Sequence, residues 1–132
     1  MRLALARRNE MLDVIRDNLN SGRVRVYSGT RPIDADTALS GNTLLAELNL
    51  ASTAFAVSSG GVLTANAITQ DSSADNGGTA SFVRVTEADG TTPVCDLSVG
   101  TSGAEINFQS LTFVQGLVVQ VTSLTISLPV GA

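Results

Sequence analysis

Residues 23–50 constrain the fold more than any other segment. They contain two segments in which apolar and polar side chains alternate, as in strands, joined by a long polar connection. In residues 23–27, valines alternate with arginine and tyrosine, and in residues 44–50 Leu, Ala, Leu and Leu occupy every second position. A period of two turns one apolar face toward a core and leaves the other face polar. The connection, residues 28–43, is rich in Gly, Asp, Ser and Thr, which form turns. We predict two paired strands, joined by a segment that either crosses between sheets or forms a contact surface.

A helix is predicted ahead of these strands, over residues 3–19. Apolar side chains recur there at the spacing of one helix face, with charged side chains opposite. The stripe consists of Leu5, Leu12, Ile15 and Leu19, with Met11 and Val14 beside them. Residues 20–22, Asn-Ser-Gly, end the helix. Because an isolated helix of this length is marginal in water, we expect its stripe to dock either on the chain's own β domain or on another molecule.

Turn residues divide much of the remaining chain into short strands. Residues 79–86 and 93–99 flank Asp89-Gly90, which is the strongest hairpin signal in the sequence. We predict that these two segments pair antiparallel. Residues 62–69 are strand-like but rich in small side chains, and we expect them to be partly paired or at a sheet edge.

The last segment, residues 116–129, is the longest strand candidate, and its apolar side chains change face partway along. Before the change the apolar positions are Leu117, Val119 and Val121, and after it they are Leu124, Ile126 and Leu128. A change of parity around Thr122 and Ser123 predicts a β-bulge or a strand that moves from one sheet to another.

Together these patterns predict an all-β fold, an antiparallel β-sandwich of jelly-roll-like form, preceded by one N-terminal α-helix. A chain of 132 residues is large enough to bury a single core without disulfides. We divide it into an N-terminal helical arm, residues 1–22, and a β-sandwich domain, residues 23–132.

Positive charge is concentrated at the start of the chain, where seven of the eight cationic residues, all arginine, lie within the first 31 positions. Arginine favours bidentate contacts with carboxylates, so we expect contact with an acidic protein surface, such as another copy. We expect no nucleic-acid partner, because acids are interspersed in residues 1–22 and that segment has no aromatic side chain for base stacking. Apolar runs are far shorter than the roughly 20 residues of a membrane span, and no signal peptide is recognisable. The sequence predicts no membrane partner and a soluble product made in the cytoplasm.

The side chains that catalysis and metal binding require are few. The chain has no His, Lys or Trp, and its one cysteine, Cys95, lies in a strand pattern typical of a buried thiol. Asp34 and Asp36 are the nearest carboxylate pair, but they lie among turn residues, where Asp caps backbone groups. The acidic segment 71–76 lacks the regular ligand spacing and the distal acid of a calcium loop. We predict no enzyme activity, no cofactor and no metal site.

The chain resembles a family of small structural proteins of tailed bacteriophages and prophages. The resemblance rests on ARRNEMLDVIRDNLNSG (residues 6–22), RVRVYSGTRPIDADTALSGNTLLAELNL (23–50), GGVLTANAI (60–68), EADGTTPVCDLSVGTSGAEINF (87–108) and VVQVTSLTISLP (118–129). It spans nearly the whole length and keeps the order of the segments. One departure is the arginine-rich helix.

The resemblance implies a virion component. Our first interpretation is a capsid cement or decoration protein that lies on the capsid surface, bridges major capsid subunits and is assembled in the host cytoplasm. A tail, neck or fibre-associated component is the second interpretation, and a free-standing β-sandwich binding module is the third. The implied partners are the major capsid protein and further copies of the chain, as a dimer or trimer. The arginines expected to contact these partners are Arg2, Arg7, Arg8, Arg16 and Arg31.

Overall fold

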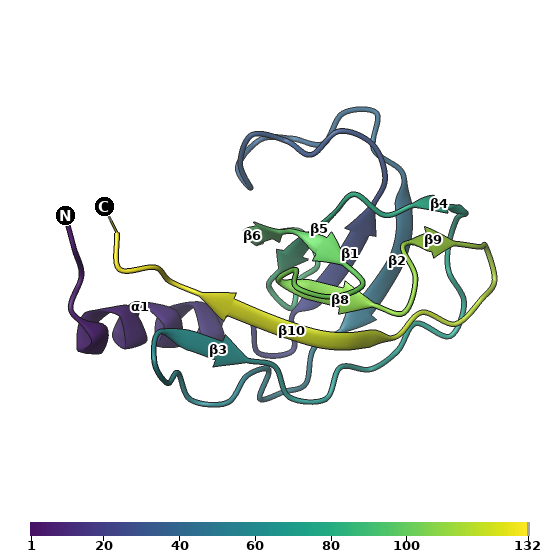
Figure 1. Cartoon of the computed structure of the whole chain (residues 1–132). Helices are drawn as coiled ribbons and strands as arrows, with labels where there is room; N and C mark the ends of the chain where they lie inside the picture. The colour runs from purple at the N-terminus through teal and green to yellow at the C-terminus, as the bar shows by residue number, and fades with distance from the viewer. Residues whose placement is uncertain (132) are drawn as a thin grey trace.

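The computed structural model describes residues 1–131 and is mostly β, with one N-terminal helix and several antiparallel sheets, as the sequence predicts (Figure 1). The elements in order are α1 (Leu5–Asn18), β1 (Arg23–Tyr27), β2 (Leu44–Asn49), β3 (Val62–Thr64), β4 (Gly78–Thr79), β5 (Phe82–Thr86), β6 (Pro93–Leu97), β7 (Val99–Gly100), β8 (Ile106–Phe108), β9 (Thr112–Phe113) and β10 (Val121–Ser127). The helix within the described residues is too short and too polar to cross a membrane.

The strands form two four-stranded sheets, with orders β2-β1-β5-β6 and β3-β10-β8-β7, and a two-stranded sheet, β4-β9. The first sheet is antiparallel throughout, and β1 pairs with β2 as predicted. The second sheet departs from the expected antiparallel pattern at one place, where β7 runs parallel to β8. β3 is an edge strand, as expected, but it ends at Thr64 rather than continuing to Thr69.

The predicted hairpin is confirmed. β5 and β6 pair antiparallel across residues 87–92, with Arg84 opposite Asp96 and Val85 opposite Cys95. Gly90 has a φ of 76°, a conformation that favours glycine. The turn residues between β5 and β6 therefore close the hairpin, as the sequence predicts.

The predicted irregularity in the last strand is also confirmed. Along β10, Val121 pairs with Phe108 and Ser123 pairs with Asn107, so one extra residue is inserted between them. This bulge lets Leu124 and Ile126 face the core despite the change of parity. The strand begins at Val121 rather than at residue 116, because residues 117–119 bond instead to the 71–74 loop.

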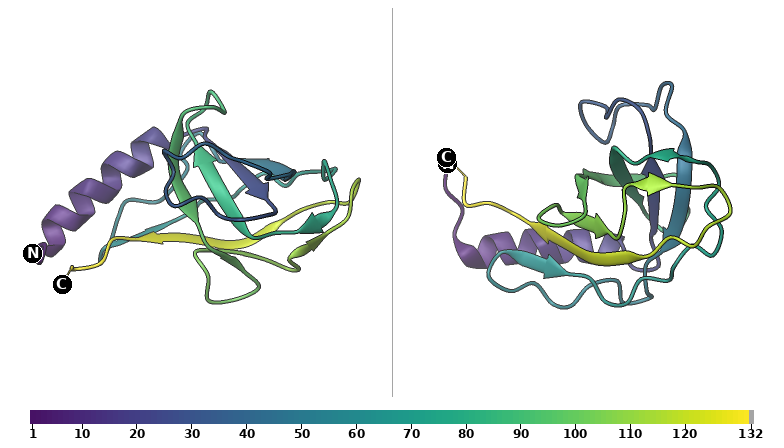
Figure 2. Two further views of the ribbon diagram at one scale, coloured as in Figure 1. Left: turned by 90° about the horizontal axis from the view of Figure 1, so that it is seen from above. Right: turned by 45° about the vertical axis from the view of Figure 1, so that its right-hand side comes forward.

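The helix docks on the chain's own β structure, beside β3 and the end of β10 (Figure 2). Leu12 and Leu19 are fully buried. The side-chain carbonyl of Asn9 accepts the Gly61 amide at 3.0 Å, and Ser58 donates from its hydroxyl to the Asn9 carbonyl. The two ends of the chain also meet, since the Leu3 amide donates to the Val130 carbonyl. Only part of the expected apolar stripe is therefore buried, and Leu5, Met11 and Val14 remain exposed.

The helix ends just before residues 20–22, as predicted. Ser21, not Gly22, takes the positive φ, at 57°. Gly22 is required for space, because a Cβ there would lie 2.5 Å from the Thr86 carbonyl oxygen. This close approach brings the end of the helix against β5.

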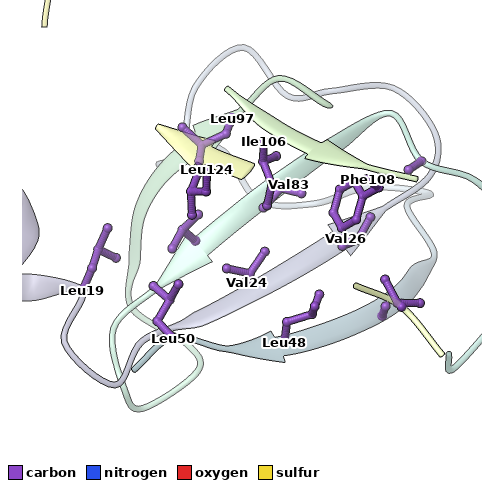
Figure 3. Close-up of a cluster of buried hydrophobic side chains, with 14 of the residues drawn as sticks. Leu19, Val24, Val26, Leu48, Leu50, Val83, Leu97, Ile106, Phe108 and Leu124 are labelled. Atoms are coloured by element: carbon purple, nitrogen blue, oxygen red, sulfur yellow. The ribbon is translucent and has the colours of Figure 1, made fainter. Parts of the chain in front are cut away.

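The apolar face of the first sheet packs together with side chains of the second sheet (Figure 3). Valines of β1 and β5 share this core with residues of β8 and β10. The labelled members are Leu19, Val24, Val26, Leu48, Leu50, Val83, Leu97, Ile106, Phe108 and Leu124. Because Leu19 belongs to this cluster, the C-terminal end of the helical segment contributes to the same core.

The long connection, residues 28–43, does not cross between sheets, because β1 and β2 are neighbours in one sheet. It folds back over the polar face of that sheet instead. The Asp34 and Thr37 carbonyls accept hydrogen bonds from the Arg84 guanidinium at 3.2 and 2.9 Å. The alternative of a sheet crossing is wrong, since this arginine holds the connection against its own sheet.

Candidate interaction surfaces

The polar face of the first sheet carries a set of arginine and carboxylate pairs. Glu47 on β2 binds both arginines of β1, with 2.9 Å between its oxygens and the nitrogens of Arg23 and Arg25. On the other side, Arg84 on β5 binds Asp96 on β6 through two hydrogen bonds of 2.8 and 2.9 Å. The strand register explains the Arg25–Glu47 and Arg84–Asp96 pairs, because the two residues of each pair lie directly opposite each other.

These pairs leave little free binding capacity on that face. Arg84 donates to Asp96 and to two loop carbonyls. The hydrogen bonds and negative charge of Asp96 raise the pKa of the Arg84 guanidinium, against the opposing effect of burial. A cavity of about 300 Å³ beside it is lined by Arg25, Tyr27, Leu39 and Arg84 among others. Since both arginines already bind carboxylates, we interpret this face as the attachment of the loop to the sheet rather than as an anion site.

The five arginines predicted to contact a partner lie in two places. Four belong to the helical segment, and Arg31 lies on the long loop, where it donates to the Asp96 carbonyl at 3.1 Å. Arg7 pairs with Glu10 at 3.0 Å on the exposed helix surface. Arg16 pairs with Asp13, as the sequence order predicts, and also with Asp17.

Arg8 and Arg2 complete the set and differ from each other. Arg8 is half-buried and donates to the Leu128 carbonyl at 3.3 Å, so it attaches the helix to the end of β10. Arg2 is exposed and has no hydrogen-bond or ion-pair partner among residues 1–131. Of the five arginines, Arg2 is therefore the one with a guanidinium fully available to another molecule.

An exposed apolar surface that the sequence pattern missed lies on the loop before β10. Val114, Leu117 and Val118 are 53, 58 and 54% exposed. The Leu117 amide donates to the Val114 carbonyl, which closes a four-residue β-turn. Gly116, the third residue of this turn, has a φ of 86°, as a type II turn requires. The turn projects apolar side chains beside a cavity of about 350 Å³, whose floor includes Phe108 and Phe113.

We name this surface the 114–118 groove. The signal that could have identified it is the glycine in Val-Gln-Gly-Leu, which marks a turn with apolar flanks rather than the start of a strand. The alternation of apolar residues from residue 117 onward predicted a strand there instead of an exposed turn.

A second exposed apolar surface is the outer face of α1. Met11 and Val14 are 47 and 62% exposed and are three residues apart, so they are neighbours on the helix surface. Arg7 precedes Met11 by one helical turn and joins the same face. The helix and the 114–118 loop lie at opposite ends of the molecule in both figures of the whole chain (Figures 1 and 2).

The carboxylates considered in the sequence cap backbone groups. Asp34 accepts from the hydroxyl and the amide of Thr37, and these bonds lower its pKa. Asp71 accepts from the amides of Glu47 and Ser73. Among the residues described, no three His, Cys, Asp or Glu side chains are grouped closely enough to hold a metal ion.

Asp89 in the hairpin turn predicts a pH dependence of stability. Hydrogen bonds from Thr92 and Thr91 lower its pKa from 3.8 to about 2. A carboxylate whose pKa is lowered by folding stabilises the fold above its ordinary pKa, and the effect is lost as the pH falls through the folded value. We expect Asp89→Ala to reduce the free energy of unfolding at neutral pH, with a difference from wild type that shrinks between about pH 4 and 2. Urea unfolding across this range measures the effect, and a pH-independent difference would contradict it.

Cys95 is expected to be unreactive in the folded protein. Burial, followed by the charges of Glu105 and Asp96, raises its pKa from 9.0 to about 12. Thiolate is the reactive form, so alkylation by iodoacetamide at pH 8 should be at least about 100-fold slower in the native protein than in urea. Mass spectrometry of the modified chain follows both rates, and equal rates would show that the thiol is accessible and ionisable.

In comparisons with known proteins, no family model, no curated protein and no solved structure matches this chain. The resemblance to phage virion proteins therefore stays a prediction. A functional proposal has to rest on the surfaces described above.

Proposed function

We propose that this protein is a structural component of a tailed-bacteriophage virion, and specifically a capsid cement protein on the capsid surface. The observation that supports this role is the pair of exposed apolar surfaces at opposite ends of a body whose core is otherwise closed. Isolated apolar residues are normal on a protein surface, but grouped ones mark interaction sites. A body with contact surfaces at two ends suits a bridge between neighbouring subunits.

The distribution of charge supports a binding role over a catalytic one. The guanidinium groups on the first sheet are occupied by Glu47, Asp96 and loop carbonyls. The carboxylates Asp34, Asp71 and Asp89 are engaged by backbone amides. A catalytic site requires groups that are free to act on a substrate, whereas a cement protein requires a stable fold with surfaces to offer.

In this proposal the major capsid protein is the partner, and Arg2 is the arginine best placed to bind one of its carboxylates. Weak contacts at both ends would act together, because attachment at one subunit raises the effective concentration for the next. We also propose that the two four-stranded sheets form a jelly-roll-like sandwich. The shared core of Val24, Val83, Ile106 and Leu124 supports this arrangement (Figure 3).

The test is to add the purified protein to mature shells that lack it. We expect saturable binding and an increase in the temperature at which the shells open. The double variant Leu117→Ser with Val118→Ser should bind at least about tenfold more weakly, because it removes exposed apolar area without altering the core. Ile33→Ser is the matched control, since Ile33 is also exposed but lies on the long loop.

Three outcomes separate the alternatives. Binding restricted to one vertex of the particle would replace the cement role with a tail or neck role. Absence of binding to any part of the particle would contradict a virion function and favour a free-standing module. If Ile33→Ser weakened binding to the shell as much as the Leu117 and Val118 variant does, the 114–118 groove would not be the contact surface.

A further inference from the structure

The loop before β4 contains the one Asn-Gly pair of the sequence, Asn76-Gly77. Every other asparagine precedes a residue with a side chain. In an Asn-Gly pair, the backbone nitrogen of the glycine and the side-chain carbonyl carbon of the asparagine approach each other readily, because glycine has no Cβ and a mobile backbone. The pair is therefore the place in the chain where a backbone nitrogen most easily attacks a side-chain amide.

The structure leaves both reacting groups accessible. Asn76 and Gly77 are exposed, and the Gly77 amide donates no hydrogen bond within residues 1–131. The Asn76 side chain donates to the Leu44 carbonyl at 2.9 Å, and its backbone amide donates to the Leu45 carbonyl at 3.4 Å. One side-chain hydrogen bond at the surface therefore has to break before the Asn76 side chain turns toward the Gly77 nitrogen.

The fold does not require glycine at position 77. Gly77 lacks a positive φ, and a Cβ there would lie 3.4 Å from the Phe113 carbonyl oxygen, which is an ordinary contact. Gly78 is more confined, because its added Cβ would lie 3.2 Å from a methyl carbon of Leu45. Alanine at position 77 therefore tests the role of the glycine without disturbing the fold.

Asn66 provides a comparison within the same chain. It is exposed, its side chain donates to the Thr53 carbonyl at 2.8 Å, and its backbone amide donates to the Ala54 carbonyl at 2.9 Å. The hydrogen bonds of Asn66 thus match those of Asn76 in kind. The difference lies in the next residue, which is Ala67 instead of glycine.

We propose that Asn76 is a deamidation site in the folded protein and converts to aspartate and isoaspartate. The Gly77 nitrogen gives its proton to hydroxide and bonds to Asn76 Cγ. The bond between Cγ and Nδ2 breaks, and Nδ2 leaves as ammonia after taking up a proton from water. A second water then opens the cyclic imide at either carbonyl, which yields aspartate or isoaspartate. Solvent water is the only co-reactant, and nothing is oxidised or reduced.

The modification changes the support of the 114–118 groove. A carboxylate at position 76 no longer donates to the Leu44 carbonyl, and it adds negative charge beside Asp75. Isoaspartate also adds a methylene to the backbone between Asp75, whose amide donates to the Leu45 carbonyl at 2.8 Å, and Gly78, which pairs with Phe113 (Figure 1).

The same loop holds the groove through Ala74. The Ala74 amide donates to the Leu117 carbonyl at 2.8 Å, and its carbonyl accepts from the Gly116 amide at 2.9 Å. Because the added methylene shifts the chain next to this attachment, we expect isoaspartate at position 76 to loosen the groove.

Peptide mass spectrometry of the purified full-length chain, incubated at mildly alkaline pH, tests the reaction. We expect release of ammonia and two products at position 76, separable by chromatography. Asn66 should react at least about tenfold more slowly than Asn76, and Gly77→Ala should slow the reaction at Asn76 by a similar factor. Circular dichroism checks that Gly77→Ala is folded.

The same incubation in urea tests whether the folded chain itself reacts. The rate in the folded chain should lie within about tenfold of the rate in urea, since one surface hydrogen bond has to break. Equal rates in wild type and Gly77→Ala, or an Asn76 that reacts only after unfolding, would overturn the proposal.

Hydrogen exchange measured by NMR tests the consequence for the groove. In the isolated isoaspartate product, the Ala74 and Gly116 amides should exchange about fivefold faster or more than in the unmodified chain. Asn76→Asp is the matched control, because it adds the charge without the methylene, and it should show a smaller increase. Unchanged exchange in the isoaspartate product would contradict the expected loosening. Both experiments use this chain alone, so their outcome is independent of capsid binding.

Discussion

Replacing Arg84 with Ala is expected to lower the free energy of unfolding by about 3–5 kcal/mol. The Arg84 and Asp96 side chains are only 10 and 4% exposed, so the variant leaves a carboxylate buried without its counter-ion. It also leaves the Asp34 and Thr37 carbonyls without their donor. Domains of this size are stable by about 5–15 kcal/mol, so the loss is a large part of the total. Urea unfolding at neutral pH measures it.

Two further variants test whether the unpaired buried charge causes this loss of stability. Arg7→Ala removes an exposed pair with Glu10 and should cost only about 0–1 kcal/mol. Replacing both partners, Arg84→Met with Asp96→Leu, should cost less than Arg84→Ala, since no unpaired charge remains buried. If Arg84→Ala lost no more stability than Arg7→Ala, the loop would not be held by this guanidinium.

Leu12→Ala is expected to lower the free energy of unfolding by about 2–5 kcal/mol. The Leu12 side chain is fully buried, although it lies on a helix that extends along one end of the molecule. Its removal leaves a cavity between α1 and the β structure, because the surrounding side chains relax only partly. Thermal and urea unfolding both report the change.

The adjacent residue provides the matched control. Met11 is 47% exposed, so Met11→Ala should change stability by no more than about 0.5 kcal/mol. Equal effects of the two substitutions would mean that the helix is not docked as described.

Local signals in the sequence predicted most of the strands. Alternation predicted β1 and β2, Asp89-Gly90 predicted the β5–β6 hairpin, and the change of parity near Thr122 predicted the bulge in β10. These features depend on residues close together in the chain. The parallel pairing of β7 with β8 and the short length of β3 depend on distant partners, and the sequence gives no local sign of them.

The contact surfaces were less predictable for the same physical reason. Composition indicated that arginines were candidates, and the spacing of Asp13 and Arg16 indicated a local pair, but neither could show that Arg8 attaches the helix to β10. The helix stripe was expected to be buried, yet Val14 is exposed because the helix packs through a narrower face. The 114–118 groove arises from hydrogen bonds between that loop and Ala74, which no spacing rule identifies.

Quantitative mass spectrometry of purified mature particles tests the proposed virion role most directly. The measured quantity is the number of copies of this chain relative to the major shell protein. A cement protein predicts a copy number that approaches that of the shell protein, and a lower thermal stability for particles from which the chain has been stripped. Particles that contain none of the chain would contradict the proposal.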